Sequence, residues 1–389
     1  MNRRNVLQLL AGIAVTGVRA SAAQSSSLRT GGRIAIAGGG ILGANIAYQL
    51  AKRGASVTLF EKSKPATGAT ANSFAWINAQ KQPLDYYRLS HAGIEAWREL
   101  HREIGDELPV RWGGSVEWAD RADRAAQLNE TVRRYEEWGY PIHLIDERRL
   151  HGLERQIVPG TVATAFHAEI EGNLDPVGAT EVILSRAVKA GAQVRYPAEV
   201  VGLDVVGDRL RAVKTSAGDA EADVLVIACG VDTPTLAAMA GLTVPLIRSP
   251  GILVHTVPQP RTIDRIVLSP LGQIKQKPNG RIVTGLDFGA AKETNTTREY
   301  GEQFLKRMSG VLPALAGASV DKVTLGFRPM PRDSHPIIGF PAGRRDVYLT
   351  VMHSGVTLGA LVGRLAAAEI LDRVDVNLLE PYRLERFKT

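Results

Sequence analysis

The sequence predicts an α/β fold in which a doubly wound, nucleotide-binding sheet is assembled from separated segments of the chain. Three observations lead to this expectation. A strand–glycine–helix–strand pattern occupies residues 33–61, a strand and a helix return at 347–371, and short strands with turn residues such as Pro278-Asn279-Gly280 lie between. The intervening region predicts a second domain, of α+β class, built on an antiparallel sheet and inserted into the first.

The first segment has the residue order of a dinucleotide-binding motif. Residues 33–37 form an apolar strand, and the turn Gly38-Gly39-Gly40-Ile41-Leu42-Gly43 leads into a helical run over 44–53. Gly38 permits the tight turn, Gly40 lets the backbone approach a pyrophosphate, and Gly43 lets the helix pack close to the strand. A second strand, 56–60, ends at Glu61, whose carboxylate can accept hydrogen bonds from ribose hydroxyls. The pattern predicts a bound adenine dinucleotide; the alternative is an empty unit whose glycines serve packing only.

Hydrophobic periodicity, together with residues that begin or end helices and strands, divides the rest of the chain into segments. Residues 33–90, 172–248 and 323–389 are assigned to the nucleotide-binding domain, and residues 91–171 and 249–322 to the inserted domain. An apolar stripe predicts a helix over 84–104, and Asp175-Pro176 predicts the start of another. Residues 110–118 are predicted to form one strand.

Composition excludes several classes of protein. The formal net charge of +7 is dispersed, and no Lys/Arg block alternates with aromatic residues, so no nucleic-acid partner is expected. Cys229 is the only cysteine, which excludes an intramolecular disulfide and a cysteine-rich metal site. No metal site is predicted.

Residues 1–23 have the features of a secretory signal of twin-arginine type. Arg3-Arg4 precede an apolar run over 6–18 that is too short for a comfortable membrane span, and small residues at 20–23 provide a cleavage site. Residues 24–32 are predicted to be a linker. We therefore expect export to the bacterial periplasm, with no integral membrane segment after signal removal; the alternative is an uncleaved amphipathic or disordered tail.

Four further motifs follow the glycine-rich turn in order. They are Phe74–Asn78, Ala228-Cys229-Gly230 at the end of a strand, Gly326-Phe327-Arg328-Pro329, and His353–Leu358 at the start of the last helix. In this order the chain resembles the FAD-dependent D-amino acid oxidase superfamily, which also contains glycine and sarcosine oxidases and D-amino acid dehydrogenases. The resemblance covers nearly everything after residue 32, and it implies a Rossmann-like FAD-binding domain.

The resemblance implies cofactor-binding roles along the whole chain. The glycine-rich turn would hold the pyrophosphate, Glu61 the adenosine ribose, and the backbone of Val200 the adenine. The N–H groups of residues 355–358 would face the flavin carbonyl edge, where a helix N-terminus stabilises negative charge. The candidate cofactor-binding residues are Gly38, Gly40, Ile41, Leu42, Gly43, Glu61, Lys62, Asn72, Ser73, Val200, Cys229, Gly230, Gly326, Gly355, Val356, Thr357 and Leu358.

One departure from some relatives concerns the FAD linkage. Some sarcosine-oxidase-like proteins tether FAD through a cysteine near the Gly-x-Arg-Pro region, and this chain has none there. Noncovalent FAD is therefore expected; the alternative is a covalent link through His353 or another histidine.

Two residues are candidates for contact with substrate. In family members with a Gly-x-Arg-Pro match the arginine binds the substrate carboxylate, so the resemblance implies that role for Arg328. A planar guanidinium suits it because it can make two parallel hydrogen bonds; the alternative is a structural salt bridge. His353 is a catalytic candidate because it adjoins the Gly355 motif, but a ring that packs or faces the pocket mouth is the favoured interpretation.

Together these features predict an exported flavoenzyme that oxidises an amine or amino acid of the D-amino acid, glycine or N-methyl amino acid type. A hydride would pass to FAD, and water would hydrolyse the imine formed. Three alternatives stay open: oxidation of a 2-hydroxy acid on the same fold, a flavin-holding electron-transfer subunit without its own small substrate, and an NAD-dependent dehydrogenase. The electron acceptor, whether oxygen, a quinone or another carrier, is also left open.

Overall fold

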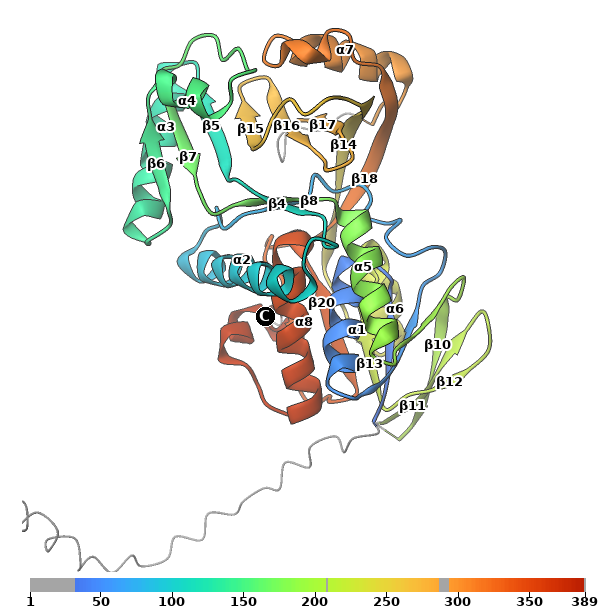
Figure 1. The fold of residues 1–389 in the computed structure, drawn as a ribbon. Coiled ribbons are helices and arrows are strands. Elements are labelled where there is room, and N and C mark those ends of the chain that lie inside the picture. The colour runs from blue at the N-terminus through green and yellow to red at the C-terminus, as the bar shows by residue number, and fades with distance from the viewer. Residues whose placement is uncertain (1–31, 208, 287–293, 388–389) are drawn as a thin grey trace, which may run out of the picture.

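The computed structural model describes residues 32–207, 209–286 and 294–387. The predicted signal at 1–23 and nearly all of the predicted linker at 24–32 lie outside these ranges. The described chain forms two layered parts, with the nucleotide-type sheet in the lower half of Figure 1 and a large antiparallel sheet in the upper half.

The lower part is built on a six-stranded sheet in which five consecutive strands are parallel to one another. A single strand, β19, pairs antiparallel with β20 at one edge. Apolar residues fill the inner strands of this sheet, as expected where both faces of a parallel sheet are covered. In spatial order the strands are β19 (Ile337–Gly339), β20 (Val347–Val351), β13 (Val224–Ile227), β1 (Arg33–Ala37), β2 (Ser56–Phe60) and β9 (Gln193–Arg195).

Three helices cover one face of this sheet: α1 (Ile41–Lys52), α5 (Pro176–Lys189) and α8 (Gly355–Asp372) (Figure 1). The long helix α2 (Leu84–Ile104) packs on α8, and its Trp97 donates from Nε1 to the Val356 carbonyl at 2.7 Å. A smaller apolar cluster on the other face is covered by α6 (Thr233–Met239) and by the sheet of β10 (Val200–Val206), β11 (Arg209–Thr215) and β12 (Ala220–Glu221).

The upper part is an eight-stranded sheet that is antiparallel except where β15 pairs with β5. Helices α3 (Ala122–Glu137), α4 (Glu147–Leu153) and α7 (Arg298–Met308) lie at its periphery. In spatial order its strands are β18 (Val320–Pro331), β14 (Leu246–Pro258), β17 (Arg281–Gly285), β16 (Gly272–Gln276), β15 (Ile266–Ser269), β5 (Ser115–Ala119), β7 (Thr164–Ala168) and β6 (Ile142–Ile145).

A small three-stranded sheet, β3 (Trp76–Ile77), β8 (Gly172–Leu174) and β4 (Val110–Trp112), lies between the two parts. The strand predicted over 110–118 is wrong, because Gly113-Gly114 divide it into β4 and β5, which belong to different sheets. Gly114 has φ +84°, which favours glycine, and a Cβ there would lie 2.2 Å from the Ala168 carbonyl oxygen. Short 3₁₀ turns occupy Gly230–Asp232, Pro313–Leu315, Asn377–Tyr382 and Leu384–Phe387.

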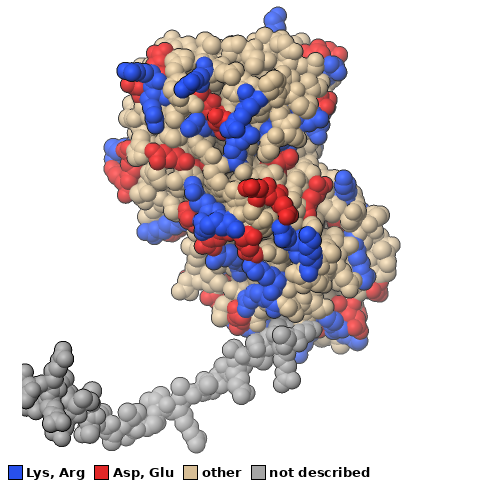
Figure 2. All heavy atoms as spheres, viewed as in Figure 1, with Lys and Arg blue, Asp and Glu red and all other residues tan. Residues whose placement is uncertain are grey.

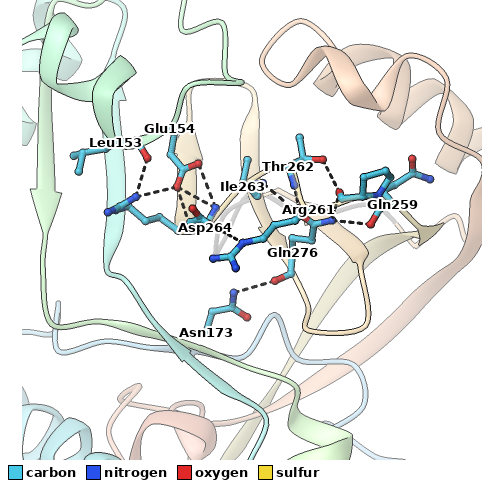
Figure 3. Close-up of polar contacts among 11 residues, drawn as sticks. Leu153, Glu154, Asn173, Gln259, Arg261, Thr262, Ile263, Asp264 and Gln276 are labelled. Atoms are coloured by element: carbon cyan, nitrogen blue, oxygen red, sulfur yellow. Dashed lines mark hydrogen bonds and ion pairs between the residues drawn. The ribbon is translucent and has the colours of Figure 1, made fainter. Parts of the chain in front are cut away.

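Side chains fix the loop between β14 and β15 onto the neighbouring strands (Figure 3). Gln276 of β16 accepts from the Thr262 amide at 2.8 Å, and Asn173 of β8 donates to the Gln276 carbonyl at 3.2 Å. Glu154, with 3% of its surface exposed, accepts from the Arg265 amide at 2.7 Å. The Glu154 carboxylate and the Gln276 side-chain amide are hydrogen-bonded to backbone groups of the loop, which ties the loop to the neighbouring strands.

The predicted fold class is confirmed: the chain is α/β, with a Rossmann-like domain assembled from separated segments and a second domain on an antiparallel sheet. Three proposed domain limits, 90/91, 248/249 and 322/323, fall within α2, β14 and β18. Continuous elements therefore run from one part into the other.

In the described part of the chain, no helix is long and apolar enough to cross a membrane. On the face seen in Figure 2, lysines and arginines are interspersed with acidic residues and form no continuous basic surface.

Candidate FAD and substrate site

Three adjoining cavities run from the edge of the six-stranded sheet to the space beneath the large sheet. The edge cavity, about 210 Å³, is lined by residues that include Phe60 and Val200. It shares Glu61 with the central cavity, about 310 Å³, which lies over the glycine-rich turn. The central cavity in turn shares His353 with the interdomain cavity, about 350 Å³, beneath β14 and β18. The three form one elongated site.

The glycine-rich turn is packed so closely that side chains cannot enter it. Gly38 has φ +111°, and a Cβ there would lie 2.4 Å from the Ala228 carbonyl oxygen. A Cβ on Gly43 would lie 2.0 Å from the Gly38 carbonyl oxygen, so this residue sets the contact between α1 and the turn without lining a cavity. Gly40, Ile41 and Leu42 line the central cavity at the N-terminus of α1, where N–H groups favour phosphate.

Glu61 lies where the edge and central cavities meet. Its carboxylate accepts from the Gly39 amide at 2.8 Å and from the Ser63 amide at 3.0 Å, which holds the loop after β2 against the turn. Lys62 lines the same two cavities and pairs with Asp232 at 2.7 Å; this hydrogen bond raises the pKa of Lys62.

Cys229 and Gly230 follow β13 and line the central cavity opposite α1. The Cys229 thiol donates to the Ala37 carbonyl at 3.2 Å, and burial raises the pKa of this thiol to about 12. A protonated, hydrogen-bonded thiol is a poor nucleophile. Its position beside the turn agrees with the expectation that Cys229 does not tether a flavin.

The start of α8 closes the wall shared by the central and interdomain cavities. Gly355 and Val356 line the central cavity, and Thr357 lines the interdomain cavity. Leu358 differs from expectation: its amide donates to the Ser354 carbonyl at 2.9 Å, and its side chain is fully buried. Counted from the N-cap residue Ser354, the first four N–H groups of α8 lack an intrahelical acceptor and the fifth, that of Leu358, has one, so Leu358 contributes packing rather than a free donor.

The interdomain cavity contains the predicted substrate residue. Arg328 of β18 lies opposite Ser249 of β14, and its Nη1 donates to the Pro250 carbonyl and contacts Ser249 Oγ at 3.5 Å. A Cβ on Gly251 would lie 2.6 Å from Arg328 Nη2, so the guanidinium lies flat on this glycine. Asn72, Ser73 and Gly326 line the same cavity, and a Cβ on Gly326 would lie 2.4 Å from Asn72 Cβ.

His353 lines both of the cavities that flank the start of α8. Burial lowers the pKa of His353 to about 3, with smaller effects in the same direction from Lys81 and Arg328. The ring is therefore neutral at physiological pH. The described residues include no group of three or more His, Cys, Asp or Glu side chains suited to a metal ion.

Comparison with known proteins now identifies the family, because residues 33–369 match the family model described as DAO, FAD dependent oxidoreductase. The chain belongs to this family. Glycine oxidase of Bacillus licheniformis is 24% identical over 90% of this chain and 96% of its own length. Mitochondrial dimethylglycine dehydrogenase of Mus musculus is also 24% identical, over 91% of this chain but only 44% of its own length.

Solved structures of the family have the same fold. L-proline dehydrogenase from P. horikoshii superposes with a TM-score of 0.81, with 25% identity, over 91% of this chain and 98% of that one. Glycine oxidase from Geobacillus kaustophilus gives 0.82, with 23% identity, over 91% and 99%. The predicted resemblance is thus confirmed, and the protein is an FAD-dependent oxidoreductase.

The residues present fit FAD along the three cavities. The crowded turn and helix N-terminus suit the pyrophosphate, and the apolar edge cavity beside Val200 suits the adenine. Glu61 lies between them, where the ribose is expected. The start of α8 places N–H groups at the boundary of the interdomain cavity, which suits the flavin ring.

Sequence reasoning missed four residues that shape this site. Thr70 accepts from the Ile41 amide at 3.1 Å and lines the central cavity, and Lys81 lines the interdomain cavity. Glu171 and Lys275 are completely buried at the junction of the sheets. Their contacts join distant parts of the chain, so no local pattern in the sequence revealed them.

Proposed function

We propose that the protein oxidises amino acids or related amines at the carbon next to nitrogen. The observation that carries this proposal is Arg328, which lies in one cavity with the N-terminal end of α8. A guanidinium there can bind the carboxylate of an amino acid. The relatives named above support this class, since glycine oxidase, dimethylglycine dehydrogenase and L-proline dehydrogenase are all named for amino acids or N-methylated amino acids.

The chain's own residues supply orientation and electrostatics. Bound FAD supplies the two-electron acceptor for the hydride that leaves the carbon next to nitrogen. Arg328 orients the substrate, and the N–H groups of Gly355 and Val356 favour negative charge at the nearby end of α8. Strands β14 and β18 cover the interdomain cavity and limit the access of water to it. His353 is assigned to the cavity wall rather than to proton transfer, because a ring with a pKa of about 3 is a weak base.

Substrate profiling tests this proposal. Purified protein would be assayed with oxygen and with an artificial dye acceptor against glycine, N-methylglycine, D-amino acids, L-proline and the matching 2-hydroxy acids. We expect turnover of amines or amino acids, with release of ammonia or a primary amine from the acyclic substrates. Turnover of hydroxy acids alone would contradict the proposal, and reduction only by a partner protein would favour an electron-transfer subunit.

Two further proposals follow from the sequence. FAD is held noncovalently, so acid precipitation should release the flavin into the supernatant; flavin that stays on the pellet would contradict this.

Export to the periplasm through the segment at 1–23 should place the activity in the periplasmic fraction. A variant carrying Arg3→Lys and Arg4→Lys should retain it in the cytoplasm.

A further inference from the structure

Helix α8 begins with a serine that does not cap it. Ser354 is the N-cap residue, and a serine at this position usually has an extended backbone and accepts a hydrogen bond from an N–H group in the first turn. Here the backbone of Ser354 has φ −78° and ψ 30°, and its side chain makes no capping hydrogen bond. Within the described part of the chain, the N–H groups of residues 355–357 therefore have neither a side-chain nor an intrahelical acceptor. They belong to residues that line the cavities suited to FAD.

The Ser354 hydroxyl is bonded to Tyr86 of α2 instead. Tyr86 Oη and Ser354 Oγ are 2.6 Å apart and share a hydrogen bond. Both residues lie in the wall of the interdomain cavity, and 5% of the surface of Tyr86 and 6% of that of Ser354 are exposed. Burial raises the pKa of Tyr86 to about 12, so the phenol keeps its proton at physiological pH. The phenol thus engages the hydroxyl that would otherwise be available to cap α8.

Other contacts fix the phenol ring and the helix independently of this hydrogen bond. The Tyr86 ring packs near the rings of His335 and Tyr382, whose centroids are 5.3 Å and 6.2 Å away. The same helix, α2, holds the first turn of α8 through the hydrogen bond from Trp97 Nε1 to the Val356 carbonyl at 2.7 Å. Removal of the phenol oxygen alone would therefore leave the ring and α8 in place and release one group, the serine hydroxyl.

We propose that Tyr86 is a positioning residue for the cofactor: it keeps the Ser354 hydroxyl away from the start of α8 and so leaves the first N–H groups of this helix available to FAD. A buried hydroxyl that loses its partner is costly unless it finds another. Capping offers one, because serine is among the residues that most favour the N-cap position. The capped N–H group would then be lost to the cofactor, and negative charge near this end of α8 would be less well stabilised.

A double-mutant cycle on the two hydroxyls tests the inference. Tyr86→Phe should raise the Kd for FAD by roughly five-fold or more, as for one lost hydrogen bond, and should make the reduction potential of the bound flavin more negative. Ser354→Ala should keep the Kd within about two-fold of wild type, because this hydroxyl does not cap the helix in the wild-type protein. The double variant should also stay within about two-fold of wild type, since no hydroxyl remains to cap α8.

Recovery of flavin fluorescence on serial dilution of the holoenzyme measures the Kd, and equilibration with redox dyes measures the reduction potential. Tyr87→Phe is the matched control and should equal wild type in both, because Tyr87 is the next residue of α2, is equally buried, and donates to the Trp138 carbonyl at 3.1 Å.

A double variant that binds FAD as weakly as Tyr86→Phe, or more weakly, would assign Tyr86 a purely structural role and overturn the inference. An unchanged Kd and potential in Tyr86→Phe would also overturn it. Neither measurement uses turnover, so these outcomes are distinct from failure of the proposed function, which substrate profiling decides.

Discussion

Arg328 has a structural anchor in addition to its proposed role in binding the substrate. One nitrogen donates to the Pro250 carbonyl, and the guanidinium plane rests on Gly251. Arg328→Lys keeps the charge but loses the planar fork, so we expect KM for the amino acid substrate to rise roughly ten-fold or more while the flavin spectrum stays unchanged. Steady-state kinetics measure this. Arg332→Lys, on an exposed residue of the following turn, is the control; an unchanged KM in Arg328→Lys would remove Arg328 from the substrate site.

His255 predicts a pH dependence of stability. Burial lowers the pKa of His255 to about 3, whereas an unfolded histidine titrates near 6.5. Between these values the unfolded chain binds the proton and the folded chain does not. The stability contribution of His255 is therefore lost as pH falls from about 6.5 towards 3, by up to about 1.4 kcal/mol per pH unit.

Replacing this ring gives the test. The free energy of unfolding of His255→Gln should fall less steeply between about pH 6 and 4 than that of wild type. Urea titrations at several pH values measure the difference. His151→Gln, on an exposed histidine, should follow wild type. If the slope of His255→Gln equals that of wild type, the buried neutral ring is not the source of the pH dependence.

Gly43 sets how closely helix α1 packs against the glycine-rich turn. Because a Cβ at this position would lie 2.0 Å from the Gly38 carbonyl oxygen, Gly43→Ala must push α1 away from β1 and distort the phosphate-facing turn. We expect loss of most bound flavin, measured as the ratio of visible to ultraviolet absorbance after purification. Gly152→Ala, where a Cβ meets nothing within 4 Å, should keep full flavin content. Full flavin content in Gly43→Ala would show that the turn tolerates the shift.

The sequence predicts a helix or strand where the residues of that element themselves carry a recognisable pattern. The first βαβ unit, α2 and α5 follow from periodicity and breakers, and the structure confirms them within a few residues. Gly113-Gly114 broke a predicted strand because its two halves join different sheets. Thr70 and Glu171 act through contacts far along the chain, and so no local pattern revealed them.

At the scale of the whole molecule, the FAD site is assembled from segments that include the turn after β1, the loop after β13 and the start of α8. Cofactor binding should therefore stabilise the entire fold. With FAD at about 100 times its Kd, the added stability is about 2.7 kcal/mol, which corresponds to an increase in Tm of about 3 °C for a chain of this length. Thermal unfolding of the deflavinated protein with and without added FAD measures the shift, and equal Tm values would contradict this assembly.

This chain belongs to a family of FAD-dependent oxidoreductases, and we propose that it uses FAD to oxidise amino acids or amines. The test is the visible absorption spectrum of the purified protein under anaerobic conditions, before and after addition of glycine, N-methylglycine, D-amino acids and L-proline. We expect a flavin band that bleaches on addition of at least one of these amines. A flavin band that persists with every amine, while a 2-hydroxy acid bleaches it, would show that the protein does not oxidise amines.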